Sequence, residues 1–130
     1  MGLLEGKVAL IFGVANKNSI GWGIAQAFHR EGATIALSYA MDKLERRVRP
    51  LGESIGCELM IQADVANADE MDAVFEAMKE KYGRTDILVH AVAFAGREDL
   101  NGRFIGVSRE GLLKAIDISA VSLIEMARRA

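Results

Sequence analysis

One stretch decides the fold: residues 7–32 read KVALIFGVANKNSIGWGIAQAFHREG. It opens with an apolar run too short for a helix, breaks at Gly13, and resumes with apolar residues at helical spacing. We therefore expect a strand over residues 8–12, a loop, and a helix over residues 20–31. Such a loop leaves backbone N–H groups unpaired at the positive end of the helix dipole. A phosphate group is the natural ligand of this arrangement.

The remaining sequence repeats this alternation of short apolar runs and longer helical patterns. The predicted strands cover residues 33–39, 58–63 and 86–92, and the predicted helices cover residues 42–55, 67–82 and 108–130, with a loop over residues 93–107. The order β-α-β-α-β-α-β-α is typical of a parallel sheet with right-handed crossovers and helices on both faces. We expect one α/β domain over residues 1–130, a Rossmann-like doubly wound parallel sheet that is incomplete, with about four β-α units.

Side-chain patterns predict how the first two helices begin, end and pack. Gly32 is expected to end the first helix. Asp42 is expected to cap the second helix, and Pro50 to end or kink it near Arg49, because proline lacks a backbone donor. The stripe of the first helix that faces the sheet is predicted to comprise Ile20, Gly23, Ile24, Ala27 and Phe28.

The third and fourth helices carry capping signals. Asn67 with Glu70 three residues later predicts a capped start for the third helix, and Gly83 predicts its end. Ser108 predicts the start of the last helix. The inward face of the third helix is predicted to carry Met71, Val74, Phe75 and Met78.

Composition restricts the class of protein. Apolar residues make up 51% of the chain and charged residues 26%, which is ordinary for a soluble globular domain. The 16 basic and 18 acidic residues are scattered, so we expect no nucleic-acid partner. The single cysteine, Cys57, excludes an internal disulfide and is expected to pack as a small core residue rather than act as a reactive thiol. Neither a signal peptide nor a run of about 18 apolar residues is visible, so we expect a cytoplasmic protein without a membrane segment.

Small or polar residues follow all four predicted strands. In a doubly wound sheet, ligands bind outside the carboxyl ends of the strands. We therefore expect a ligand site built from residues 13–20, 39–41, 64–65 and 92–96. The coincidence of four strand ends is stronger evidence than the glycine pattern alone.

Two residues of this predicted site have a structural alternative. Ser19 can donate its hydroxyl to a phosphate oxygen, or it can cap the helix that follows. Asp64 can lie beside an adenine ring, where Val65 would add a backbone group and an apolar wall, or it can accept hydrogen bonds from the start of the next helix. We favour the ligand role for both residues and keep the structural roles open.

The two histidines do not suggest a catalytic or metal site. His29 lies on the outer side of the first predicted helix and is expected at the surface. His90, inside the fourth predicted strand, is expected to be a packed, hydrogen-bonded residue, and a pH-dependent role is the alternative. The histidines are far apart and no carboxylates recur at ligand spacing, so we expect no metal site.

Several segments together resemble a known family. They are GVANKNSIGWGIA from Gly13, Asp64-Val65, HAVAFA from His90, and DISAVS from Asp117. The chain closely resembles the enoyl-acyl-carrier-protein reductases of bacterial type II fatty-acid synthesis, a divergent branch of the short-chain dehydrogenase/reductase superfamily. The resemblance covers the whole chain.

This resemblance implies an activity, a cofactor and partners. The implied reaction is the NADH-dependent reduction of the trans-2 double bond of an enoyl thioester carried on acyl carrier protein. Ala95 would face the acyl substrate, and related enzymes imply a homotetramer. The implied cofactor contacts are Gly13, Ser19 and Ile20 at the pyrophosphate and its ribose, Asp64 and Val65 at the adenine, and Val92 near the centre of the cofactor.

The chain departs from the family pattern in two ways. Ala40 and Met41 follow the second strand, so no cation there would pair with a 2′-phosphate, and we expect NADH rather than NADPH. Family members run to roughly twice this length, and a Tyr-x6-Lys pair lies in their second half. Neither Tyr39 nor Tyr82 is followed by lysine seven residues later. We therefore name no catalytic residue in this chain and expect the tyrosine and lysine downstream of Ala130. The chain is expected to be the N-terminal half of a reductase, and to be inactive by itself.

Other interpretations remain open at this stage. The chain could be a non-catalytic dinucleotide-binding module, or another short-chain dehydrogenase that acts on a carbonyl. Val92-Ala93 speaks against the latter, since that group usually has Asn-Ala-Gly after the fourth strand. The last helix is more hydrophobic than a surface helix requires, and it could pack in the core or, as in related dehydrogenases, between subunits.

Overall fold

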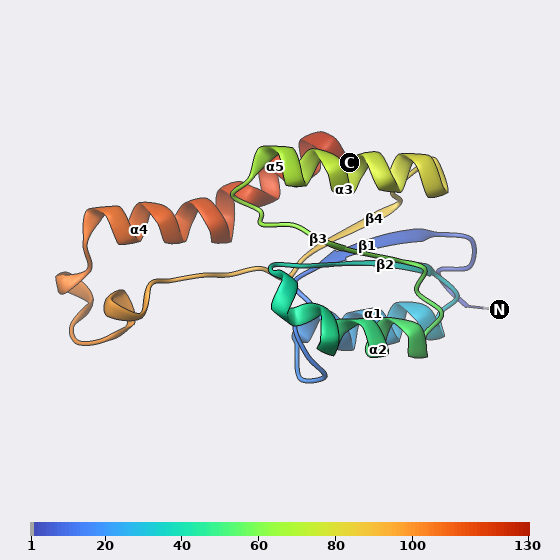
Figure 1. Ribbon diagram of the computed structural model, residues 1–130, viewed down its shortest axis with the longest axis horizontal. Helices are drawn as coiled ribbons and strands as arrows, with labels where there is room; N and C mark the ends of the chain where they lie inside the picture. The colour runs from blue at the N-terminus through green and yellow to red at the C-terminus, as the bar shows by residue number, and fades with distance from the viewer. Residues whose placement is uncertain (1) are drawn as a thin grey trace.

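A computed structural model describes residues 2–130 as a four-stranded parallel sheet with helices on both faces (Figure 1). The strands are β1 (Val8–Phe12), β2 (Thr34–Tyr39), β3 (Leu59–Gln62) and β4 (Ile87–His90). Their order across the sheet is β3-β2-β1-β4, and every neighbouring pair is parallel. The predicted α/β, Rossmann-like and incomplete sheet is confirmed.

Helices form a layer on each side of the sheet (Figure 1). Helices α1 (Ile20–Arg30) and α2 (Glu45–Ser54) cover one face, and helices α3 (Ala68–Tyr82) and α5 (Ser122–Arg129) cover the other. Helix α4 (Arg109–Ile116) extends away from the sheet, beyond the carboxyl ends of the strands. None of the helices in residues 2–130 is long and apolar enough to cross a membrane.

The central strand β1 shows why the sheet is buried on both faces. Side chains alternate across a strand, so Ala9 and Ile11 pack with α1 and α2, whereas Leu10 and Phe12 pack with α3 and α5. All five residues of β1 are buried. A strand with helices on both sides must be apolar on both sides, which explains the continuous run VALIF.

The stripe predicted for α1 is partly wrong. Ile20 is 81% exposed and Gly23 is also exposed, while Gly21, Trp22 and Ala25 are the buried residues. A Cβ at Gly21 would lie 3.3 Å from the Val14 side chain, so the helix start approaches the sheet through a glycine and not through an isoleucine. Apolarity alone therefore did not reveal which side of the first turn faces inward.

The cap predicted at Asp42 is wrong, and so is the helix end predicted at Pro50, while the alternative of a kink at Pro50 stays a prediction. Asp42 does not cap α2: it lies inside a 3-10 turn, Asp42–Leu44, and α2 begins only at Glu45. Pro50 does not end the helix at Arg49, because α2 continues through it to Ser54. The carbonyl that loses its partner to Pro50 belongs to Arg46, and both residues are exposed, so water can satisfy it.

The other capping predictions are confirmed. The Asn67 side chain accepts from the Glu70 N–H at 3.1 Å, and Gly83 ends α3 in the left-handed conformation with φ 74°. Gly32 follows the end of α1 with φ 96°. The Ser108 hydroxyl accepts from the Gly111 N–H at 3.0 Å at the start of α4. The predicted inward residues of α3 are all buried: Met71, Val74, Phe75 and Met78.

The C-terminal helix is not the single helix predicted over residues 108–130. A π-helical segment, Asp117–Val121, separates α4 from α5, and two 3-10 turns, Arg97–Leu100 and Phe104–Gly106, occupy the preceding loop. Core packing is found only in α5, at Ser122 and Met126. Ile118 is half-buried, and six large apolar side chains of this region are exposed: Leu112, Leu113, Ile116, Val121, Leu123 and Ile124.

Candidate functional site

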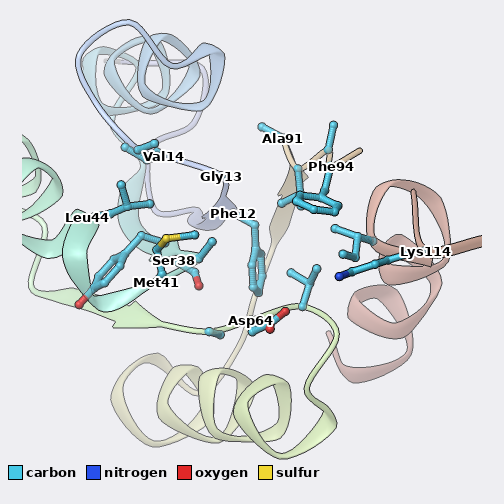
Figure 2. Close-up of a pocket in the computed structure, with 18 residues that line it drawn as sticks. Phe12, Gly13, Val14, Ser38, Met41, Leu44, Asp64, Ala91, Phe94 and Lys114 are labelled. Carbon is cyan, nitrogen blue, oxygen red and sulfur yellow. The ribbon is translucent and has the colours of Figure 1, made fainter. Parts of the chain in front are cut away.

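A cavity of about 460 Å³ opens at the carboxyl ends of all four strands (Figure 2). This is the edge of the sheet where the sequence predicts a ligand site. The residues that follow the strands form most of its wall, and α4 and the π-helical segment complete it. The lining residues are Phe12–Ala15, Ser38–Met41, Leu44, Ala63–Val65, Ala91–Phe94, Lys114 and Ile118.

Gly13 allows the close approach of two strand ends. Its φ is 103°, a conformation that favours glycine, and a Cβ there would overlap the carbonyl oxygen of Ala91. The Gly13 N–H donates to the carbonyl oxygen of Ser38 at 3.2 Å. Gly13 thus connects the ends of β1, β2 and β4 at the wall of the cavity, and any other residue would push them apart.

Ser19 organises the glycine loop instead of capping α1. Its Oγ accepts from the backbone N–H groups of Ala15 at 2.9 Å and Asn16 at 3.1 Å, and it makes no capping hydrogen bond to the helix. A hydroxyl has two acceptor sites and one donor proton. With both acceptor sites engaged, the proton remains free to donate to a ligand.

The start of α1 presents the unpaired donors predicted from the sequence. Within residues 2–130, the N–H groups of Ile20 and Gly21 have no acceptor, and Ile20 is largely exposed. Ser19 and Ile20 do not line the cavity themselves. Ser19 is joined to the lining residue Ala15 by the hydrogen bond from the Ala15 N–H, and Ile20 comes next in the chain. Free N–H groups at a helix N-terminus beside a glycine turn fit a phosphate group.

Asp64 combines the two roles considered for it. One carboxylate oxygen, Oδ1, accepts from the Ala66 N–H at 2.9 Å, as the structural alternative predicts for the turn before α3. The residue is exposed, and it lines the cavity together with Val65. Figure 2 shows the carboxylate at the floor of the cavity. The local turn therefore orients Asp64 without removing it from the site.

The segment after β4 is held by the π-helical segment. The Phe94 N–H donates to Ser119 Oγ at 3.0 Å, and the Ser119 hydroxyl lies 3.3 Å from the Phe94 carbonyl oxygen. Val92 lines the cavity, whereas Ala95 lies just outside the lining, next to Phe94. The Lys114 ammonium lies 5.3 Å from the centre of the Phe94 ring (Figure 2).

Seven lining residues fall outside the ranges predicted from the sequence: Phe12, Ser38, Leu44, Ala63, Ala91, Lys114 and Ile118. Lys114 and Ile118 come from the last helical region, and no local pattern connects that region to the strand ends. Ser38 lies inside a strand, where the pattern indicates only burial. The DISAVS segment could have indicated that this region contacts the strand ends, because a serine such as Ser119 in an apolar helix needs a hydrogen-bond partner.

The cysteine and histidine side chains behave as predicted, and Tyr39 shows no sign of activation. Tyr39 lines the cavity, but burial raises its pKa above the ordinary value, so its phenol stays neutral. Burial likewise raises the pKa of the buried Cys57 thiol. His29 is exposed, and His90 is half-buried with a hydrogen bond to Ser122. Residues 2–130 contain no cluster of three potential metal ligands.

Comparisons with known proteins agree with this geometry. The family model described as enoyl-(acyl carrier protein) reductase matches residues 13–130. The enoyl-[acyl-carrier-protein] reductase [NADH] FabI of Aquifex aeolicus is 48% identical over 98% of this chain and 47% of its own length. The Bacillus cereus FabI is 46% identical over the full chain and 52% of its own length. This chain spans about half the length of these curated relatives.

Solved structures show the same relationship. The crystal structure of the Aquifex aeolicus reductase matches with a TM-score of 0.96 at 47% identity, over 98% of this chain and 51% of that one. The reductase from Anaplasma phagocytophilum, solved in complex with NAD, matches with a TM-score of 0.95 at 40% identity, over 99% of this chain and 49% of that one. The chain therefore belongs to the enoyl-(acyl carrier protein) reductase family.

Proposed function

We propose that residues 1–130 form the NAD-binding, N-terminal half of an NADH-dependent enoyl-acyl-carrier-protein reductase that folds as one larger domain. One observation carries the proposal: the glycine turn at Gly13 and the free N–H groups of Ile20 and Gly21 lie beside a cavity at the strand ends. The turn leaves no space for a Cβ, and the free donors suit a pyrophosphate. The wall of the cavity is otherwise mostly apolar, as a base and a ribose require.

The residues present fit a dinucleotide along its length. Gly13, Ser19 and Ile20 would hold the pyrophosphate and its ribose through backbone N–H groups and the free Ser19 proton. Asp64 and Val65 would flank the adenine, and Val92 would contact the central part of the cofactor. These assignments agree with the family resemblance, and each is a proposal for this chain.

The proposed reaction needs groups beyond these residues. When bound, NADH supplies the hydride that adds to the β-carbon of the trans-2 enoyl thioester. Negative charge then develops on the thioester oxygen, where a phenol and a lysine ammonium would stabilise it. Neither Tyr39 nor Tyr82 has the lysine partner, so we assign these roles to residues outside this chain and expect the 130 residues alone to be inactive. The contribution of this chain is to bind the cofactor and to position the strand ends around it.

NADH is the proposed cofactor rather than NADPH. Ala40 and Met41, which line the cavity after β2, carry no charge that would pair with a 2′-phosphate. The structure of the Bacillus cereus relative contains NADP⁺ together with an indole naphthyridinone. Fluorescence titration of this chain with NADPH beside NADH is expected to give the lower dissociation constant for NADH.

We propose an enoyl thioester on acyl carrier protein as the substrate, with Ala95 facing the acyl chain at the edge of the cavity. We also propose a cytoplasmic homotetramer without nucleic-acid or membrane partners. The exposed apolar side chains of α4 and α5 support association with other copies of the chain, since large exposed apolar faces mark interaction surfaces. Analytical ultracentrifugation of the chain tests the oligomeric state.

Fluorescence titration with NADH tests the proposed function. The folded 130-residue chain is expected to bind NADH saturably, and Ser19→Ala and Asp64→Ala are each expected to raise the dissociation constant about fivefold or more. Ser54→Ala, an exposed serine of α2 whose hydroxyl contacts only the local Leu51 carbonyl, is the matched control. Binding that is absent, although circular dichroism shows a folded chain, would contradict the proposal that these residues hold the cofactor by themselves.

A further inference from the structure

Ser38 presents a buried hydroxyl that the fold does not use. Its side chain is 1% exposed, and within residues 2–130 its Oγ is the one buried side-chain nitrogen or oxygen atom without a hydrogen-bond partner. Buried polar atoms are nearly always paired, because leaving one unpaired costs free energy. An orphaned hydroxyl therefore calls for a ligand or a water molecule.

The sheet explains why no protein partner is available. Ser38 lies beside Phe12 of β1 and Ile61 of β3 in the register, and both neighbours are apolar. Its backbone carbonyl accepts from the Gly13 N–H, a role that any residue type could fill. Ala36, two residues earlier on the same face, is fully buried without a polar atom. A serine at position 38 is therefore not required by strand packing.

Ser38 belongs to the wall of the cavity, and its Oγ is buried within that wall. Ser38 at the end of β2 and Asp64 after β3 both line the cavity (Figure 2). Ala63 and Val65, also from the end of β3, line it with them. The free N–H groups that suit phosphate lie elsewhere, at the start of α1. The wall around Ser38 is apolar apart from Asp64, which suits a flat heteroaromatic ring better than a charged group.

We propose that Ser38 is a cofactor-binding residue whose hydroxyl makes a hydrogen bond to the adenosine half of the dinucleotide. This inference rests on the proposed function, since it places the adenine between Ser38 and Asp64. A serine hydroxyl can donate to a ring nitrogen or accept from an exocyclic amine, so it matches either edge of a purine. The bond is made only when the cofactor is bound.

A binding and stability comparison of Ser38→Ala with the unaltered chain tests this role. The variant removes only the orphaned oxygen, so its urea unfolding midpoint is expected to stay unchanged or to rise. Its dissociation constants for ADP and NADH are expected to rise about five- to tenfold, as for the loss of one hydrogen bond. The affinity for nicotinamide mononucleotide, which lacks the adenosine half, is expected to change less than twofold.

Ser122→Ala is the matched control, because Ser122 is equally buried but paired with His90 and the Ile118 carbonyl. It is expected to lower the unfolding midpoint and to leave ADP affinity within twofold. An unaltered ADP affinity of Ser38→Ala, or a lowered midpoint without weaker binding, would overturn the inference and leave the proposed function intact. Failure of the folded, unaltered chain to bind either ADP or NADH would instead contradict the proposed function, and the inference with it.

Discussion

His90 and Ser122 join the sheet to the last helix through a hydrogen bond of 2.7 Å between His90 Nε2 and Ser122 Oγ. The Ser122 hydroxyl proton is directed to the Ile118 carbonyl at 2.6 Å, so Nε2 of His90 is the donor to Ser122. The bond fastens the end of β4, next to the cavity, to the π-helical segment and α5. His90 is therefore the packed, hydrogen-bonded residue that the sequence predicts.

Ser122→Ala is expected to lower the free energy of unfolding by about 1–3 kcal/mol, because it leaves the half-buried His90 N–H unpaired. Urea unfolding followed by circular dichroism measures the change. Ser54→Ala, at an exposed serine of α2, is expected to change stability by less than about 0.5 kcal/mol. Equal effects of the two substitutions would show that the His90–Ser122 bond does not stabilise the fold.

Gly13→Ala and Gly23→Ala are expected to act in opposite directions. At Gly13 the new Cβ would overlap the Ala91 carbonyl oxygen at a φ of 103°, so we expect a loss of more than about 3 kcal/mol and no NADH binding. At Gly23, inside α1, an added Cβ would meet no atom within 4 Å, and alanine should stabilise the helix by about 0.5–1 kcal/mol. Thermal unfolding of both variants checks the signs, and a tolerated Gly13→Ala would contradict the close approach of β1 and β4.

The acid side of the stability profile is expected to depend on Asp86. Its Oδ2 accepts from the Val8 N–H at 2.8 Å and from Arg84 Nε at 2.9 Å, and these donors hold the pKa of the carboxylate below its usual value of 3.8. A depressed pKa means that the folded state binds the proton more weakly than the unfolded state. The resulting stabilisation is fully present above the unfolded pKa and is lost as the pH falls through it towards the lower folded pKa.

Asp86→Asn should therefore flatten the decline in stability below about pH 5. Urea unfolding between pH 3 and 7 measures the slope. Glu76→Gln, at an exposed residue of α3 outside the ion pairs of residues 2–130, should leave the slope unchanged. A decline as steep in Asp86→Asn as in the unaltered chain would rule out Asp86 as its source.

The ion pair between Asp72 and Arg129 is expected to contribute little. Arg129 Nε lies 2.7 Å from Asp72 Oδ1 and connects α5 to α3, but the Asp72 side chain is 63% exposed. Asp72→Asn should lower the unfolding free energy by less than about 1 kcal/mol, and the difference should shrink in 1 M salt because exposed pairs are screened. Urea unfolding at low and high salt provides the comparison. A larger, salt-independent loss would indicate that the pair is effectively buried.

Local signals predicted the elements that depend on a few neighbouring residues. Helix α3 begins after Asn67 and ends at Gly83 as predicted, because a capping side chain and a left-handed glycine act within one turn of the chain. The Gly13 turn and the carboxyl-end cavity also followed from the sequence, since a parallel α/β order places its strand ends together. The helix end predicted at Pro50 and the positions of Ile20 and Gly23 in the α1 stripe were wrong, because solvent exposure and the packing of Gly21 against the strand ends are tertiary properties.

The sequence by itself determined the family, the parallel sheet and the edge of that sheet where a ligand would bind. These depend on residue periodicity and on motifs contained in short segments. Only the tertiary structure decided that Ser19 organises the loop, that Ser38 is orphaned in the cavity, and that Lys114 comes to lie over Phe94. Each of these three features depends on the direction of a side chain in the folded protein. Lys114 and Phe94 are also far apart in the chain, so no local sequence pattern specifies their contact.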